Sequence, residues 1–196
     1  MPNSQGTTLI SEKEYLESEL ARDIKHHLID GQVYPVSGAS ANHARIAGNI
    51  LAEFGAHLKN STCEPLGSNM KIKVNSNFFY SDVMVVCDFD ESQPIFTETP
   101  TIIVEVLSKT TRRIDETTKR FNYINIPTLQ EYVLIEQDFV DIEVVRRSEG
   151  WQPKHYFLGD EVTFESIGLT LPVEEVYHRV KNQDMTEFLA RMKNDK

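Results

Sequence analysis

Residues 101–107 read Thr-Ile-Ile-Val-Glu-Val-Leu, and this stretch decides the predicted fold. It is apolar on both faces apart from Glu105, which is typical of a strand in the middle of a covered sheet. An ionised carboxylate left there without partners would cost several kcal/mol, so we expect Glu105 to be paired or to bind a metal. A structural ion pair with Lys or Arg and a functional carboxylate both remain open at this point.

Local signals upstream of this strand predict a helix and a hairpin. Ser11 followed by Glu14 forms a capping-box pattern, which begins a helix that runs through about Leu20. Asp30-Gly31 lies between two β-compatible stretches and predicts a tight hairpin turn, because Gly tolerates the positive φ that such a turn needs.

The remaining elements follow from hydrophobic periodicity. A helix is predicted from about 41 to 59, with a buried stripe formed by Ile46, Ile50, Phe54 and Leu58. After it we predict strands 70–74, 79–86 and 101–107, a helix 112–125, strands 131–136, 140–146 and 151–157, and a short helix 173–180. This order predicts an α/β (α+β) fold, a mixed β-sheet flanked by helices with an N-terminal hairpin and a C-terminal β-meander.

Length and charge limit the class of protein. The chain has 196 residues, which suits a single domain over 1–196 with residues 181–196 as a helical tail. It carries 20 Lys+Arg against 30 Asp+Glu, a net charge of −10. This balance argues against a protein that coats nucleic acid non-specifically, because that role needs an excess of basic residues.

Several features predict a cytoplasmic protein. No apolar run approaches the roughly 20 residues of a membrane helix, and residues 1–6 lack the layout of a signal peptide. Cys63 and Cys87 are the two cysteines, and neither lies in a C-x-x-C pair. We therefore expect neither a disulfide scaffold nor a cysteine-based zinc site.

The tail carries an apolar stripe at helical spacing, formed by Met185, Phe188, Leu189 and Met192. Such a stripe predicts a helix that docks on its own domain, and a dimer contact is the main alternative.

Two acidic residues could form a metal site. Asp82 begins the strand that precedes Glu105, and the two strands are joined by one loop. If the strands are adjacent, the two carboxylates could converge on one point. Hard cations such as Mg²⁺ prefer such ligands, usually one or two carboxylates completed by waters and substrate phosphate.

The helix after Glu105 supplies a third element, because Asp115, Lys119 and Tyr123 line one side of it. Alone, such a row usually forms a solvated face with an Asp–Lys pair, while Ile114, Phe121 and Ile124 suit the core. Residues 109–120 also hold five basic against two acidic residues. This local excess could attract a phosphate backbone.

These features together resemble a known family. Asp82-Val83, the segment 104–108, the row of Asp115, Lys119 and Tyr123, and the strand 131–134 are similar to the PD-(D/E)XK nuclease superfamily. More narrowly, the chain resembles the bacterial Uma-two family of putative restriction endonucleases over about residues 8–180. Shorter matches lie at 14–16, 29–31, 37–40 with His43, and Arg146-Arg147 before Trp151.

The resemblance implies a restriction-endonuclease-like fold with a four- or five-stranded mixed sheet and a divalent-metal site. Asp82 and Glu105 would be the ligands of Mg²⁺ (or Mn²⁺). The superfamily places a lysine two residues after the second acid, where this chain has Leu107. The resemblance assigns that lysine to the next helix, where Lys119 matches, and Lys109 is a second candidate.

Other positions depart from the family pattern. Ser81 replaces the usual proline, and His27 stands where the family usually has a glutamate on the first hairpin strand. His27 could ligate a metal, which would favour Mn²⁺ or later transition metals over Mg²⁺, or it is a half-buried strand histidine. His43 is expected near the site, or as a hydrogen-bonded helix residue.

The resulting hypothesis is a metal-dependent endonuclease that acts on nucleic acid, with DNA as the expected substrate, and the resemblance implies a homodimer. A first alternative is a non-catalytic nucleic-acid- or protein-binding module on a nuclease-like fold. A second is a structural oligomerisation protein in which Glu105 pairs with Lys119 or an arginine.

Overall fold

The computed structural model describes residues 9–36, 38 and 40–194. The expectation for residues 1–6, the start of the resemblance at residue 8, and its matches at Ser37 and Ala39 lie outside the described residues.

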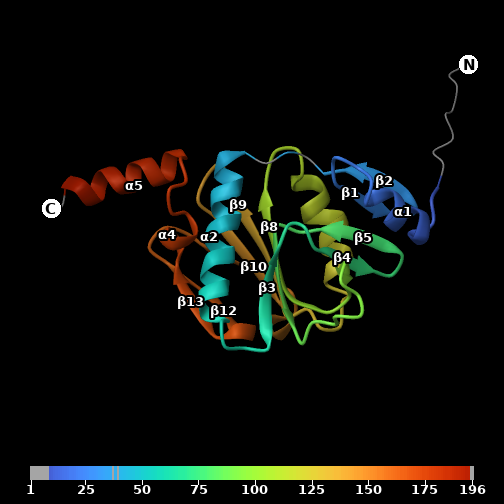
Figure 1. The fold of residues 1–196 in the computed structure, drawn as a ribbon. Helices are drawn as coiled ribbons and strands as arrows, with labels where there is room; N and C mark the ends of the chain where they lie inside the picture. Colours follow the sequence, from blue (N-terminus) through green and yellow to red (C-terminus); the bar gives the residue numbers. More distant parts are fainter. Residues whose placement is uncertain (1–8, 37, 39, 195–196) are drawn as a thin grey trace, which may run out of the picture.

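Two β-sheets form the centre of the molecule (Figure 1). The first has the strand order β2 (Gln32–Pro35), β1 (His26–Ile29), β5 (Asn77–Tyr80), β4 (Lys71–Val74) and β7 (Phe96–Thr97). The second has the order β11 (Pro153–Tyr156), β10 (Ile142–Arg146), β9 (Glu131–Glu136), β8 (Pro100–Leu107), β6 (Val83–Cys87) and β3 (Cys63–Gly67). A separate hairpin pairs β12 (Glu161–Phe164) with β13 (Leu169–Pro172).

The second sheet is mixed, as predicted, because β8 and β9 pair in parallel while its other neighbouring strands are antiparallel. It has six strands rather than the four or five that the resemblance implied. The predicted N-terminal hairpin is present as β1–β2, and the C-terminal meander as β9–β10–β11.

Five α-helices and a π-helix occur in the described residues: α1 (Glu12–Glu19), α2 (Ala41–His57), η1 (Ile114–Lys119, π-helical), α3 (Arg120–Tyr123), α4 (Val173–Val176) and α5 (Gln183–Asn194). Short 3₁₀ turns lie at η2 (Arg147–Glu149) and η3 (Glu165–Ile167). The predicted capping box is confirmed, since Ser11 N donates to Glu14 at 2.8 Å and Glu14 N donates to Ser11 Oγ at 3.3 Å.

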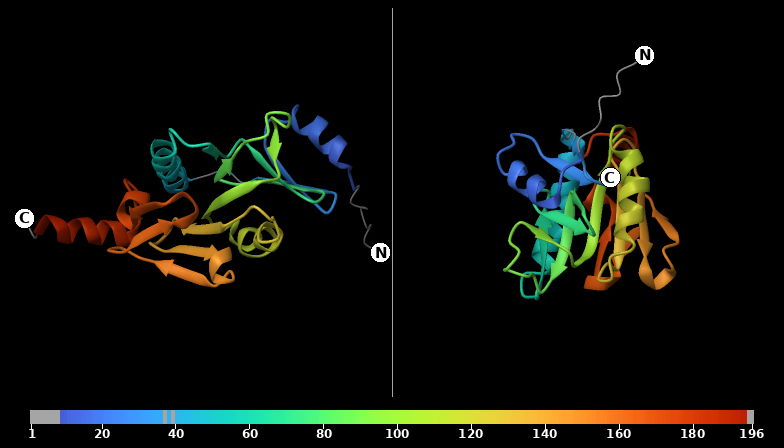
Figure 2. Two further views of the ribbon diagram at one scale, coloured as in Figure 1. Left: turned by 90° about the horizontal axis from the view of Figure 1, so that it is seen from below. Right: turned by 90° about the vertical axis from the view of Figure 1, so that its right-hand side faces the viewer.

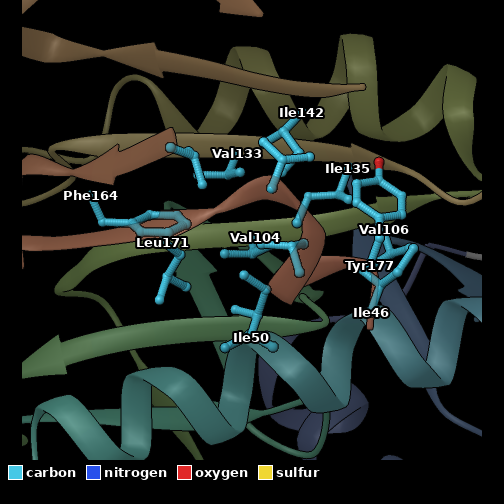
Figure 3. Packing of buried hydrophobic residues seen from close by; sticks show 14 of the residues in the cluster. Ile46, Ile50, Val104, Val106, Val133, Ile135, Ile142, Phe164, Leu171 and Tyr177 are labelled. Carbon is cyan, nitrogen blue, oxygen red and sulfur yellow. The ribbon is translucent and has the colours of Figure 1, made fainter. Parts of the chain in front are cut away.

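The main core lies between α2 and one face of the second sheet (Figure 3). Ile46 and Ile50 of α2 face Val104 and Val106 of β8, and all four side chains are buried. Figure 2 shows η1 and α3 on the other face of this sheet, where Tyr123 packs into a second apolar cluster. Each fully buried side chain of this kind contributes about 1.5–3 kcal/mol relative to an exposed one. The sheet is therefore covered on both faces.

The predicted strand 79–86 is wrong as one element. The chain leaves the first sheet after Tyr80 and enters the second at Val83, so only Ser81 and Asp82 join them. The apolar run is continuous because each half is buried in a different sheet. Hydrophobicity alone therefore gave no signal of the break.

A disulfide joins Cys63 of β3 to Cys87 of β6, a bond that the expectation of no disulfide scaffold did not foresee. These residues are register partners on adjacent strands. The register of the two strands brings the cysteines together although they are 24 positions apart in the sequence. The test for a C-x-x-C motif detects only cysteines that are close in sequence. Disulfides persist mainly in oxidising compartments, so the cytoplasmic location stays a prediction.

The tail helix α5 projects from the body of the molecule (Figures 1 and 2). Met185 near its start is buried, whereas Leu189 is 50% and Met192 48% exposed. Docking on its own domain therefore accounts for only the first part of the predicted stripe. Across the described ranges, no helix combines the length and apolar character needed to cross a membrane.

A buried ion pair connects the second sheet to the β12–β13 hairpin. Arg146 of β10 is 1% exposed, and its Nε lies 3.3 Å from Glu131 of β9. Its guanidinium also donates to Thr163 O at 2.6 Å, and Glu131 accepts from Ser166 N at 2.8 Å. The two buried charges thus form an ion pair with each other, and both also form hydrogen bonds with backbone atoms of the hairpin segment.

We predict that Arg146→Met lowers the free energy of unfolding by about 3–5 kcal/mol, because it leaves Glu131 buried without its cation. The matched control is Arg191→Met, which removes an exposed i,i+4 pair with Glu187. The control should change stability by no more than about 0.5 kcal/mol. Urea unfolding of the three proteins measures both values, and equal midpoints would contradict the assignment.

Candidate functional site

A cavity of about 790 Å³ opens between the β1–β2 hairpin, the first half of α2, the start of β6, β8 and η1. Most of the acidic and basic residues singled out in the sequence line it: His27, His43, Asp82, Glu105, Asp115 and Lys119.

Glu105 lies in β8, and Asp82 comes directly before the neighbouring antiparallel strand β6. Val83 of β6 pairs with Val104 of β8, so the next step of the register sets Asp82 opposite Glu105. Directly opposed residues have Cβ atoms about 4.5–5.5 Å apart and point to the same face of a sheet. Val106 N donates to Asp82 Oδ2 at 2.7 Å, which fixes Asp82 against β8. The two carboxylates therefore enter one cavity.

Glu105 is held by two side chains from the following helical segment. Lys119 Nζ lies 2.9 Å from Glu105 Oε1, and Tyr123 donates its hydroxyl to the same oxygen at 3.2 Å. Lys119 also donates to Tyr80 O at 3.0 Å. The expected pairing of the Glu105 carboxylate is thus present, and its cation is Lys119.

Asp115 and Lys119 lie at opposite ends of the π-helical turn η1. Asp115 Oδ1 is 2.9 Å from Lys119 Nζ, yet this buried oxygen makes no hydrogen bond of normal geometry. π-Helical turns are rare and are frequent at functional sites. In this turn, both charged side chains point inward rather than to solvent.

The interpretation of the Asp115, Lys119 and Tyr123 row as a solvated face is therefore wrong. All three residues are buried, whereas Phe121, which was expected in the core, is 71% exposed. The driving force is the carboxylate of Glu105, which needs these polar partners on the side of the helix that meets β8.

The cavity holds more negative than positive charge. Burial raises the pKa of Glu105 well above its usual value, and the charges of Asp115 and Asp82 add to this against the opposing effect of Lys119. Burial lowers the pKa of Lys119, but the charges of Glu105 and Asp115 outweigh it and raise the pKa overall. Lys119 therefore stays charged, and a cation in the cavity would relieve the remaining repulsion.

His43 of α2 lies at the site, as one of its two interpretations expected. Its Nε2 is 3.2 Å from Asp82 Oδ2. Burial lowers the pKa of His43, but the hydrogen bond and charge of Asp82 raise it overall. The histidine thus orients one oxygen of Asp82.

His27 of β1 is buried and accepts a hydrogen bond at Nδ1 from Tyr80 N at 3.2 Å. Burial, with the nearby charge of Lys119, lowers the pKa of His27 to about 2. The imidazole is therefore neutral.

Other predicted features stay outside the site. Lys109 is exposed and does not line the cavity, and Leu107 packs in the second apolar cluster. The basic excess of residues 109–120 is largely neutralised by ion pairs of Arg112 with Glu136 and of Arg120 with Glu143. The prediction of a basic segment that attracts phosphate is therefore not supported by the structure.

Lys25 and Tyr34 are among the cavity residues that sequence reasoning missed. A signal was available, because the Asp30-Gly31 turn fixes the hairpin register and sets Tyr34 opposite His27. Lys25 lies two positions before His27 and so shares its side of the extended chain.

Asp82 and Glu105 are the residues that could hold a divalent cation. Each has one carboxylate oxygen, Asp82 Oδ1 and Glu105 Oε2, without a hydrogen-bond partner among the described residues. Within those same ranges no cluster of three or more His, Cys, Asp or Glu could hold a metal. Two carboxylates nevertheless fit Mg²⁺, which usually keeps waters and substrate phosphate in its shell.

Comparison with known proteins identifies similar chains. The family model Uma2, described as "Putative restriction endonuclease", matches residues 12–174. "Uncharacterized protein slr1290" of Synechocystis sp. (strain ATCC 27184 / PCC 6803 / Kazusa) is 34% identical over 173 residues, covering 86% of this chain and 91% of its own. "Uncharacterized protein sll1609" of the same strain is 33% identical over 136 residues, covering 67% and 77%.

A solved structure shares the fold. The crystal structure of a putative nuclease belonging to DUF820 from Anabaena variabilis ATCC 29413 superposes with a TM-score of 0.73 at 17% sequence identity. The match covers 86% of this chain and 97% of that one. At this identity the likeness supports the restriction-endonuclease-like fold and says nothing of individual side chains.

We predict that the unusual protonation of Glu105 makes stability depend on pH. Its folded pKa is raised, so its contribution to stability is fully present below the unfolded pKa of about 4.3 and is lost as pH rises through the folded pKa. In EDTA, wild type should therefore lose stability relative to Glu105→Gln as pH rises above the unfolded pKa of the carboxyl group.

In wild type, Lys119 keeps its charge during this measurement, because the charges of Glu105 and Asp115 raise its pKa. Glu116→Gln, at an exposed acid on the same turn, is the matched control and should parallel wild type. The measured quantity is the difference in free energy of unfolding between wild type and Glu105→Gln. If this difference does not change with pH, Glu105 has an ordinary pKa and the prediction is wrong.

Proposed function

Since the chain belongs to the Uma2 family of putative restriction endonucleases, we propose that it is a divalent-metal-dependent endonuclease that hydrolyses phosphodiester bonds of nucleic acid, with DNA as the expected substrate. The observation that carries the proposal is the meeting of Asp82 and Glu105, from adjacent strands, in a cavity that also holds Lys119.

In this proposal, Asp82 and Glu105 would hold Mg²⁺ or Mn²⁺, and each keeps one carboxylate oxygen without a hydrogen-bond partner among the described residues. A bound divalent cation would polarise the scissile phosphate and lower the pKa of an attacking water. The excess of carboxylates over cations in the cavity favours such an ion, because each carboxylate interacts unfavourably with its neighbours.

Lys119 has a constrained role in this mechanism. An ammonium group has three donors, and here they face Glu105, Asp115 and Tyr80 O. In this structure, Lys119 orients the Glu105 carboxylate and forms an ion pair with it. If the Glu105 carboxylate turns toward a ligand, one N–H of Lys119 is released and can stabilise negative charge on a phosphate oxygen.

Two further side chains act as positioning residues. Tyr123 donates to Glu105 Oε1, and His43 contacts Asp82 Oδ2. Each of these contacts uses one carboxylate oxygen. The other oxygens, Glu105 Oε2 and Asp82 Oδ1, have no hydrogen-bond partner among the described residues. Hydrogen bonds of this kind orient metal-ligating groups and tune their affinity.

Assembly as a homodimer is part of the same proposal. The exposed apolar side of α5, with Leu189 and Met192, supports it as a surface that the described residues leave uncovered.

A non-catalytic binding module is the second candidate function. Two observations favour it: His27 replaces an expected glutamate, and Leu107 is buried where the superfamily has its lysine. Such a module would bind nucleic acid without cleavage, and EDTA would not affect binding. The Glu105–Lys119 ion pair does not distinguish the endonuclease from the binding module, because the buried carboxylate of Glu105 needs a partner in both.

We predict that the protein nicks supercoiled plasmid with Mg²⁺ or Mn²⁺ and not in EDTA. Asp82→Asn and Glu105→Gln should each reduce the rate about 100-fold or more, on the scale of losing one group that stabilises transition-state charge. Isothermal titration should show Mn²⁺ binding by wild type and its loss in both variants.

The control variant Glu116→Gln removes one negative charge, as Glu105→Gln does, but at a residue outside the cavity. It should nick plasmid at the wild-type rate. The proposal is wrong if wild type binds neither Mg²⁺ nor Mn²⁺ and all variants behave alike. Binding of plasmid with no cleavage in either metal would support the second candidate.

A further inference from the structure

The tautomer of His27 follows from its hydrogen bond. A backbone N–H can only donate, so the bond from Tyr80 N requires a lone pair on Nδ1. Burial lowers the pKa of His27 to about 2, so the ring carries a single proton at neutral pH. That proton must therefore be on Nε2.

The Nε2–H group has no acceptor in the part of the chain that the structure describes. None of the described residues accepts from it, although the side chain is 95% buried, with 5% exposed. Nε2 is also not among the fully enclosed polar atoms that lack a partner, which are Ser81 Oγ, Asp115 Oδ1 and Glu143 Oε1. Because His27 lines the cavity, its remaining donor reaches cavity space.

A protonated Nε2 has no lone pair to offer a metal ion. In this arrangement, the ring nitrogen that faces the cavity is a donor, and the one that could ligate is held by Tyr80. The group therefore suits a ligand that accepts hydrogen bonds.

Two ammonium groups in the cavity can interact with an anionic ligand at this donor, and the cation of the proposed function would offset the surplus of carboxylates. Lys119 is close enough for its charge to act on His27, and Lys25 also lines the cavity. Lys25 Nζ donates to Ser68 O at 2.7 Å, which holds its ammonium group at the wall. A buried neutral donor in a cavity that also holds two ammonium groups matches a non-bridging phosphate oxygen.

We propose that His27 is a phosphate-binding residue whose Nε2–H donates to a non-bridging oxygen of the nucleic-acid backbone, beside Lys25, and that it is not a metal ligand. The choice of a nucleic-acid phosphate rests on the proposed function, whereas the donor itself follows from the geometry of His27.

The first test reads the tautomer directly in the wild-type protein. Long-range ¹H–¹⁵N spectra of ¹⁵N-histidine-labelled protein at pH 7 in EDTA should show His27 protonated at Nε2. Adding a short oligothymidylate should shift that resonance, and inorganic phosphate should shift it at higher concentration. Protonation at Nδ1, or an unchanged resonance with both probes, would overturn the proposal.

The second test uses matched variants. His27→Asn keeps an oxygen near the position of Nδ1 for Tyr80 N and removes the Nε2 donor, and should weaken oligothymidylate binding in EDTA about tenfold or more. His27→Gln places an amide N–H near the position of Nε2 and should recover part of the affinity. His57→Asn, at an exposed histidine of α2, is the control and should bind as wild type.

Metal titration separates this proposal from the proposed function. His27→Asn should keep wild-type Mn²⁺ affinity, and its loss would overturn the inference. If His27→Asn binds oligothymidylate as wild type does while Asp82→Asn loses Mn²⁺ and cleavage, the inference alone fails. If Asp82→Asn has no effect while His27→Asn loses binding, the proposed endonuclease fails and the phosphate site stands.

Discussion

The burial of Glu105 in the middle of β8 is the constraint on which the rest of the structure depends. A carboxylate between two covered faces is tolerated only with partners, and the chain supplies them from the segment that follows. The helix must therefore turn its polar row inward, which places Asp115 beside Lys119 and leaves Phe121 in solvent. β8 also pairs with β6, so that Asp82 shares the cavity.

The features that sequence predicted well are set by neighbours along the chain. The capping box at Ser11, the turn at Asp30-Gly31 and the four-residue spacing of the α2 stripe each depend on contacts within a few residues. The meeting of Asp82 and Glu105 was also predictable, because one loop joins their strands and consecutive strands often pair. The placement of Lys119 required the family resemblance as well.

The features that sequence missed depend on which layer a residue enters. A continuous apolar run gives no indication that its two halves belong to different sheets. Hydrophobic periodicity therefore could not predict the break between β5 and β6. Cys63 and Cys87 meet through the register of β3 and β6. The polar row of η1 could not be assigned to the interior until its partner Glu105 was known to face it. In each case, the missing information is a contact between distant segments.

The link between the two sheets limits how this protein can change in length. Only Ser81 and Asp82 separate β5 from β6, and Tyr80 at the end of β5 contacts both His27 and Lys119 through its backbone. Side chains alternate along a strand, so one inserted residue here would exchange the faces on which Val83 and Met84 pack. The exposed stretch from residue 90 to 95 carries no such restriction. Insertions and deletions, in natural relatives or in engineered versions, should accumulate in that stretch and be absent between the two sheets.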